Sequence, residues 1–218
     1  MTYVGLSRNG NISTNLAVSK DCLNWQRKGI IFGEQDKDVV LFPEKIDGKY
    51  VAFDRPEGNF EFTTPHVWTA FSKDLIYWGK LKPIQLSKKE GFSRSGAGPP
   101  PIKTKKGWLL IFHAATSKHP KGLLYSIEKG LGLNIPIYDS YAVWAVLLDL
   151  KNPDKIIARS HHSLIHPKIK SFEDKMVIFP TGIVEDNDSI LVYSGAGDIY
   201  VSVHKIGLKD IMKSLERV

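Results

Sequence analysis

Apolar residues come in short runs separated by turn-forming residues, and one arrangement of these runs occurs three times. In the clearest copy, residues 39–56, two apolar runs flank Asp47-Gly48 and the second run ends in a polar Asp-Arg-Pro. An Asp-Gly pair between apolar runs predicts a tight hairpin, because a type I′ turn needs a positive φ at both central residues. Residues 99–113 and 179–195 repeat the order of proline, short strand, polar turn and apolar strand. Recurrence at intervals of tens of residues predicts a repeat fold.

A second pattern alternates with these hairpins. The sequence Ser-Lys-Asp-x-x-x-Trp occurs at residues 19–25 and again at 72–78, and a looser polar turn occurs at 150–154. We expect strands on both sides of these turns, at residues 15–19 and 28–32, 68–72 and 81–86, and 144–149 and 156–159. A unit of hairpin, turn and strand then holds about four short strands, as a propeller blade does. A β-sandwich is the competing all-β fold, but sandwich strands do not repeat such a turn.

The two ends of the chain add to this prediction. Residues 1–7 resemble the second strand of a hairpin, so we expect the chain to start inside a repeat. Apolar residues at helical spacing predict a short C-terminal helix over 207–215, and residues 118–137 read as a loop insertion. We therefore predict one all-β domain over residues 1–218, an incomplete propeller of roughly four blades with a short C-terminal helix.

Composition limits the kind of partner. The net charge of +7 comes from scattered lysines and arginines, which indicates a solvated basic surface that could help collect anions rather than a nucleic-acid groove. Cys22 is the single cysteine, so no internal disulfide forms.

No apolar run reaches the ~18 residues that span a bilayer, and no signal pattern opens the chain, so we expect a cytoplasmic protein without membrane partners. The histidines at 161, 162 and 166 lack zinc spacing, and no metal is expected.

Charged and polar residues that could bind a ligand lie at the ends of the predicted apolar strands. These are Arg55, His113 and Asp198, and Lys103 follows a Gly-Ala-Gly-Pro-Pro-Pro segment. In a propeller the ends of the innermost strands meet at a shared pocket. Arginine binds phosphate oxygens with two parallel hydrogen bonds, lysine adds a point charge, and aspartate accepts hydrogen bonds from sugar hydroxyls. The pattern thus predicts a site for an anion beside a polyol.

Each of these residues also has a purely structural interpretation. Arg55 could pair with Asp54 or Glu44, since all three lie in one predicted hairpin. Lys103 could be an exposed hairpin lysine, His113 a buried histidine, and Asp198 a turn residue.

Seven motifs occur in one order along nearly the whole chain. They are Lys-Asp-Val-Val-Leu-Phe-Pro-Glu-Lys-Ile at 37–46, Asp-Arg-Pro at 54–56, Gly-Ala-Gly-Pro-Pro-Pro-Ile-Lys-Thr at 96–104, Gly-Trp-Leu-Leu at 107–110, Leu-Leu-Asp-Leu at 147–150, Phe-Pro-Thr-Gly at 179–182 and Tyr-Ser-Gly-Ala-Gly-Asp at 193–198. This set resembles glycoside hydrolase family 130, whose members are five-bladed β-propeller enzymes that act on β-mannosides, mostly by phosphorolysis.

The resemblance implies a reaction and a set of site residues. Members transfer a mannosyl group from a β-mannoside to inorganic phosphate with inversion, which gives α-mannose 1-phosphate. The expected partners are therefore a mannoside oligosaccharide and phosphate as co-substrate, with no cofactor. By the same resemblance, the phosphate-binding residues are Arg55, Lys103, His113 and Lys37, and the substrate-binding residues are Asp38, Asp198 and Tyr141.

The chain departs from the family pattern in three places. Tyr141-Ala142 replaces a usual Tyr-Arg pair, and the insertion at 118–137 is long. The family's general acid is an aspartate in an Asp-Pro-Arg motif, and this chain contains no Asp-Pro-Arg, so no catalytic acid is assigned to it. Loss of general acid catalysis lowers the reaction rate by a factor of ~10²–10⁴.

Three hypotheses follow from the sequence. The first is a phosphorylase lacking its N-terminal part, and the second is a non-catalytic carbohydrate- or phosphate-binding remnant that self-associates through an open sheet edge. The third is a β-mannoside hydrolase that uses water.

Overall fold

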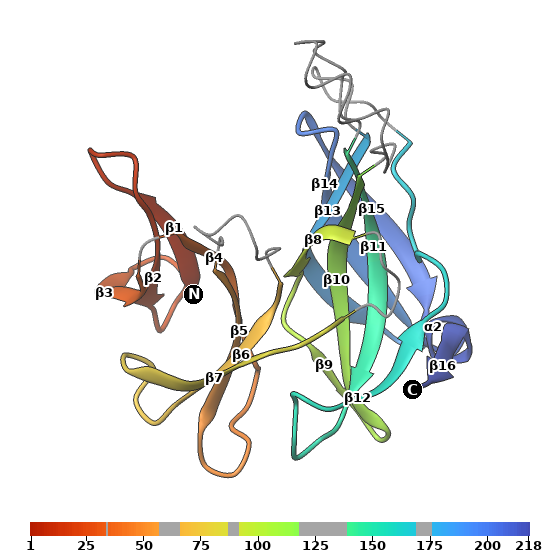
Figure 1. Cartoon of the computed structure of the whole chain (residues 1–218), viewed down its shortest axis with the longest axis horizontal. Helices are drawn as coiled ribbons and strands as arrows, with labels where there is room; N and C mark the ends of the chain where they lie inside the picture. Colours follow the sequence, from red (N-terminus) through yellow and green to blue (C-terminus); the bar gives the residue numbers. More distant parts are fainter. Residues whose placement is uncertain (34, 57–65, 87–91, 118–138, 169–175) are drawn as a thin grey trace, which may run out of the picture.

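The computed structural model describes residues 1–33, 35–56, 66–86, 92–117, 139–168 and 176–218. The predicted insertion at 118–137 lies outside these residues. The described chain is built almost entirely of strands in three sheets, with one short helix (Figure 1). No helix in these ranges is long and apolar enough to cross a membrane.

The first two sheets are each a simple antiparallel blade. The three-stranded sheet holds β1 (Thr2–Leu6), β2 (Ile12–Val18) and β3 (Gln26–Phe32) in that order. The four-stranded sheet holds β4 (Asp36–Leu41), β5 (Tyr50–Pro56), β6 (Trp68–Ser72) and β7 (Trp78–Pro83). Figure 1 places them side by side at the N-terminal end of the molecule.

The third sheet has nine strands and joins two further blades. Its strands are β8 (Phe92–Ala97), β9 (Ile102–Thr104), β10 (Gly107–Ser117), β11 (Asp139–Leu148), β12 (Ile156–Ser160), β13 (Met176–Asp186), β14 (Ser189–Ala196), β15 (Tyr200–Gly207) and β16 (Leu215–Arg217), and α2 (Leu208–Ser214) precedes β16. β11 and β13 meet in parallel through two residue pairs only, whereas the pairs on either side are antiparallel. The four antiparallel groups of strands confirm the partial propeller predicted from the sequence. Helix α2 confirms the predicted C-terminal helix.

The repeated turns have the structure that their sequences predict. Asp47 and Gly48 have φ values of 46° and 73°, as a type I′ turn requires. In the two Ser-Lys-Asp turns, the Oδ1 atoms of Asp21 and Asp74 each accept two backbone N–H groups at 2.8–2.9 Å. The tryptophan that closes each turn donates its indole N–H to a backbone carbonyl at 3.1 Å. The repetition therefore extends to individual hydrogen bonds.

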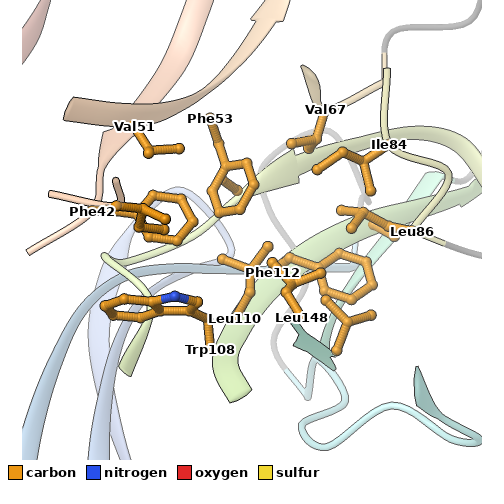
Figure 2. Close-up of a cluster of buried hydrophobic side chains, with 14 residues drawn as sticks. Phe42, Val51, Phe53, Val67, Ile84, Leu86, Trp108, Leu110, Phe112 and Leu148 are labelled. Carbon is orange, nitrogen blue, oxygen red and sulfur yellow. The ribbon is translucent and has the colours of Figure 1, made fainter. Parts of the chain in front are cut away.

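A buried apolar cluster holds the four-stranded sheet against the nine-stranded sheet. Phe53 of β5 and Trp108 of β10 both contact Phe42, with ring centroids 4.9 Å and 5.2 Å from that of Phe42. Figure 2 shows these rings facing one another between the two sheets. Because side chains alternate along a strand, Phe112 of β10 also faces this cluster while His113 faces the opposite side of the sheet. The packing thus fixes where the side chains of β4 and β5 meet those of β10.

Candidate functional site

Two side chains, one from each of these sheets, meet at the carboxylate of Asp38. Arg55 of β5 lies with its Nε atom 2.9 Å from Asp38 Oδ2, and His113 of β10 lies with its Nε2 atom 3.5 Å from the same oxygen. Arg55 is 4% exposed and His113 is fully buried. A buried arginine is rarely left without a partner, and here Asp38 is its counter-charge.

An irregularity in β4 turns Asp38 toward this position. The pairing of β4 with β5 shifts register between Lys37 and Val40, and Asp38 has a φ of 57°. A bulge of this kind redirects a side chain away from the regular alternation of the strand, and aspartate tolerates the left-handed conformation better than most residues. The local backbone thus presents one carboxylate to two neighbouring strands.

Gly96 of β8 makes room for the cluster. β8 and β10 pair with Gly96 opposite His113, and a Cβ atom on Gly96 would lie 2.5 Å from both Asp38 Oδ2 and His113 Nε2. Neither neighbour is the free end of a long flexible side chain. The close approach of β8 to the cluster therefore requires glycine at this position.

Burial and charge act in opposite directions on the ionisation of the cluster. Burial alone would raise the pKa of Asp38, but the hydrogen bond from His113 and the charges of Arg55 and Lys37 outweigh it, so its pKa lies below the usual value. Burial also lowers the pKa of His113, and it outweighs the attraction of Asp38. The cluster at neutral pH is therefore an Asp38 carboxylate, an Arg55 cation and a neutral imidazole.

A pair of buried carboxyl groups, Asp36 and Asp54, lies next to the Arg55 backbone. Asp36 and Asp54 are both buried, at 8% and 2% exposure. Burial first, and then the like charge of Asp36, raises the pKa of Asp54 to about 8. Burial raises the pKa of Asp36 as well, although its hydrogen bonds with Asp54 and the Arg55 backbone N–H oppose that rise. At neutral pH the pair therefore holds a proton, because two buried carboxylates in contact repel each other.

Two of the other predicted residues lie beside the cluster. Lys37 is the cross-strand partner of Arg55 in the pairing of β4 with β5. The ring centroid of Tyr141 on β11 lies 6.2 Å from that of His113. Together with Arg55, His113 and Asp38, this makes five of the seven predicted site residues that the fold brings together.

The remaining two predicted site residues are Lys103 and Asp198. Lys103 of β9 is exposed, forms an ion pair with Glu44, and sits opposite Trp108 on β10. Trp108 and His113 are five residues apart on that strand, or roughly 17 Å at 3.3 Å per residue. Asp198 is an exposed turn residue after β14 with a φ of 55°. Among the described residues no hydrogen bond or ion pair joins Lys103 or Asp198 to Asp38, so their part in the site stays a prediction.

Two residues that the sequence reasoning did not select complete the surroundings. The ring of Phe179 on β13 lies 3.9 Å from that of His113, centroid to centroid. Arg94 of β8 pairs with Ala115, two positions from the pairing of Gly96 with His113, so it shares their face of the sheet. Its Nε atom is buried and has no hydrogen-bond partner among the described residues. The alternation of Arg94 with Gly96 along a strand was the signal that could have revealed it.

The antiparallel blades place the chain in the β-propeller class, and basic and aromatic side chains gather where two of the blades meet. A family model described as beta-1,4-mannooligosaccharide phosphorylase matches residues 1–217. The chain therefore belongs to glycoside hydrolase family 130.

Individual relatives agree with this assignment. A 1,2-beta-oligomannan phosphorylase of Thermoanaerobacter sp. is 38% identical over 201 residues, which are 90% of this chain and 59% of that protein. A beta-1,2-mannobiose phosphorylase of Listeria innocua is 30% identical over 217 residues, which are 94% of this chain and 53% of that protein. The solved structure of the Listeria innocua beta-1,2-mannobiose phosphorylase with beta-1,2-mannobiose superposes with a TM-score of 0.81 at 28% identity, covering 98% of this chain and 56% of that one. The chain spans little more than half the length of these relatives.

Proposed function

We propose that this chain carries the phosphate-binding part of a β-mannoside phosphorylase. The observation that carries the proposal is the meeting of Arg55 and His113 at Asp38, in a chain whose relatives are named as mannoside phosphorylases. Lys37 and Arg94 add positive charge on two neighbouring strands. A phosphate ion that enters this group would find cationic donors on three strands of a rigid scaffold.

The chemistry that this site would support is transfer of a mannosyl group to phosphate. One phosphate oxygen forms a bond to the anomeric carbon while the bond from that carbon to the glycosidic oxygen breaks, and the leaving oxygen takes up a proton. Arg55 and Arg94 would orient the phosphate and offset its charge, and the neutral imidazole of His113 can donate one hydrogen bond. Asp38 would hold Arg55 in place and accept hydrogen bonds from sugar hydroxyls.

The proton for the leaving oxygen needs a separate carboxylic acid. Asp54 holds a proton but is 2% exposed, so it has no open path to a sugar. The chain contains no Asp-Pro-Arg, the motif in which the family carries its general acid. The proposal therefore covers phosphate and mannoside binding and assigns the proton donor to none of the residues of this chain.

Phosphate affinity tests the site directly. We expect Arg55→Ala to weaken phosphate binding by roughly tenfold or more, because a charge-assisted hydrogen bond is worth about 1.5–3 kcal/mol. Isothermal titration calorimetry measures the affinity, and Lys105→Ala, an exposed lysine outside the cluster, is the matched control. Circular dichroism melting checks that each variant folds. Should Arg55→Ala fail to fold, Arg55→Lys keeps the charge without the planar fork, and an affinity equal to that of the unaltered chain would argue against the proposal.

A second candidate function is binding without catalysis, and the missing Asp-Pro-Arg favours it. The two functions separate when the purified chain is incubated with β-linked mannobiose and phosphate. Formation of α-mannose 1-phosphate would exclude the binding remnant, and phosphate-independent release of mannose would identify a hydrolase. Reading the DNA upstream of the Met1 codon provides an independent test, since a coding stretch for Asp-Pro-Arg there supports a longer phosphorylase. The cytoplasmic location and self-association expected from the sequence stay predictions.

A further inference from the structure

A cavity of about 160 Å³ lies on the other face of the nine-stranded sheet from His113. Strands β8, β10, β11, β12 and β16 contribute to its walls. The residues that matter for its chemistry are Leu86, Phe92, Phe112, Trp144, Arg159 and Glu216. Phe112 neighbours His113 on β10 and points to the opposite face, so the sheet itself separates the cavity from the Asp38 cluster.

The strand register places an arginine and a tryptophan together in this cavity. Phe112 pairs with Trp144 across β10 and β11, and Val146 pairs with Arg159 across β11 and β12. Trp144 and Val146 are two positions apart on β11, so Trp144 and Arg159 are diagonal neighbours on one face. Diagonal neighbours in an antiparallel sheet lie within reach of long side chains.

These two side chains carry buried donors that the fold does not satisfy. The Nε and Nη1 atoms of Arg159 and the Nε1 atom of Trp144 are buried and have no hydrogen-bond partner among the described residues. The remaining guanidinium nitrogen, Nη2, donates to the carbonyl of Gln85 at 2.6 Å. Burial lowers the pKa of Arg159 below its usual value, which reflects a cation without sufficient compensation. An unsatisfied buried donor destabilises the fold, so a ligand with acceptor oxygens would recover stability.

The acidic residue that pairs with Arg159 does not supply an acceptor for these unsatisfied donors. Glu216 of β16 pairs with Arg159 of β12. However, its side chain is 69% exposed and its carboxylate contacts His161, with Oε2 3.4 Å from Nδ1. Among the described residues that line the cavity, Glu216 is the one acidic side chain. Because Glu216 is turned away in this manner, a bound molecule with acceptor oxygens would satisfy the open donors of Arg159.

Apart from Arg159, Ser160, His161, Glu216 and Arg217, the residues that line the cavity are apolar or aromatic. Leu86 and Phe112 are 3% and 2% exposed and belong to the core cluster between the sheets, where Figure 2 shows them next to each other. Phe92 packs edge-on against Trp144 with ring centroids 5.1 Å apart. Inorganic phosphate would leave these apolar walls uncovered, whereas a molecule with a ring or hydrocarbon body would cover them.

We propose that this cavity binds a small organic oxyanion, with its oxygens on Arg159 and Trp144 and a ring-shaped or apolar body against Phe112. Carboxylates and phosphate esters share the chemistry that this arrangement recognises. The proposal does not depend on the phosphorylase function, because the two groups of residues lie on opposite faces of one sheet.

Benzoate and benzyl alcohol form a matched pair of probes, since both carry a phenyl ring and only benzoate is an anion. The chain has 5 tryptophans, and comparison with Trp144→Phe assigns the Trp144 indole signal in a ¹H–¹⁵N NMR spectrum. We expect benzoate to shift this signal in a saturable way and benzyl alcohol to shift it far less. No shift with benzoate up to tens of millimolar, or equal shifts with both probes, would overturn the proposal.

Two arginine variants test the anion contact. Arg159→Gln removes the Arg159 cation and leaves Arg217 in the lining, and we expect it to weaken benzoate binding roughly tenfold or more. Arg27→Gln, at an exposed position on β3, is the matched control and leaves benzoate binding unchanged. Equal affinity in Arg159→Gln and the unaltered chain would contradict the assignment. Should Arg159→Gln not fold, the comparison of benzoate with benzyl alcohol in the unaltered chain decides the question.

Discussion

At the scale of single residues, the candidate site is a group of charges that compensate one another. Asp38 is the central acceptor, because Arg55 and His113 approach the same oxygen from two sheets. Arg94 differs because, among the residues that the structure describes, its buried Nε atom has no hydrogen-bond partner and no ion pair of the kind that Asp38 forms with Arg55. A phosphate oxygen is an acceptor that would suit such a donor. The site thus combines a compensated arginine with one that still offers a hydrogen bond.

This contrast between basic residues predicts which of them matter for phosphate. We expect Arg94→Ala to weaken phosphate binding by roughly tenfold, because it removes a buried donor on the His113 face. Lys103→Ala should leave the affinity unchanged, because Lys103 is exposed and paired with Glu44. Calorimetric titration with inorganic phosphate measures both variants. A loss of affinity in Lys103→Ala alone would favour the arrangement implied by family resemblance over the geometry of this structure.

The buried carboxyl pair predicts a dependence of stability on pH. Asp54 has a pKa raised to about 8, whereas an unfolded chain has a pKa near 3.8 at this group. The folded state therefore binds more protons than the unfolded state between these values, and the free energy of unfolding falls as pH rises from about 4 to about 8. Asp54→Asn keeps the size of the side chain without an ionisable group. We expect it to flatten this pH dependence and to stabilise the protein at pH 9 by about 1–3 kcal/mol, measured by urea unfolding.

Asp47→Asn serves as the control for this experiment, because Asp47 is an exposed turn residue. Its unfolding free energy should follow that of the unaltered chain across the same pH range. An unchanged pH profile in Asp54→Asn would show that the carboxyl pair does not hold a proton in the folded protein.

At the scale of elements, the site depends on strands that approach one another unusually closely. β8 lies against β10 at Gly96, and β4 bulges so that Asp38 leaves the regular alternation. The turns that join the strands are autonomous by comparison, since their hydrogen bonds lie within a few residues of one another. Local sequence is therefore enough for the turns, whereas the site needs two or three strands in register.

Substitution of Gly96 tests the close approach of β8. We expect Gly96→Ala to lower the stability by about 1–3 kcal/mol and to reduce phosphate affinity, because its Cβ would lie 2.5 Å from Asp38 and His113. Gly79→Ala on β7 is the control, since a Cβ there meets nothing within 4 Å. Thermal unfolding and phosphate titration give the two readouts. A Gly96→Ala variant with the stability and affinity of the unaltered chain would contradict the geometry described for the cluster.

At the scale of the whole molecule, the site exists only because two sheets are packed together. Asp38 and Arg55 belong to the four-stranded sheet and His113 belongs to the nine-stranded sheet. The aromatic cluster around Phe42, Phe53 and Trp108 lies between these sheets and sets their relative position (Figure 2). A change in that cluster should therefore reach the site without touching it.

Truncation of Phe53 tests this connection. The side chain is fully buried, and a phenylalanine-to-alanine change in a core costs about 3–5 kcal/mol. We expect Phe53→Ala to lower the melting temperature and also to weaken phosphate binding, although Phe53 makes no contact with the predicted ligand. Tyr77→Ala removes an aromatic ring that is 80% exposed and should change neither. Phosphate affinity that is unaltered in a folded Phe53→Ala would show that the site does not depend on this packing.

The sequence alone determined the all-β class, the repeated turns, the short helix and the family. Each of these follows from local pattern: Asp47-Gly48 dictates its own turn, and the Asp21 and Asp74 turns satisfy their own backbone groups. The sequence also selected most members of the site through motifs that name residues one at a time.

Only the tertiary structure decided which of those residues meet. It separated Lys103 from the cluster and added Arg94 and Phe179, because the register of β8, β10 and β13 depends on contacts between distant segments. It also placed Arg159 beside Trp144 on the far face of the sheet, where no motif indicated a site. The alternation of side chains along one strand is a local property of the sequence. The pairing of strands depends on contacts between distant segments, and this pairing decides which charged side chains share a site.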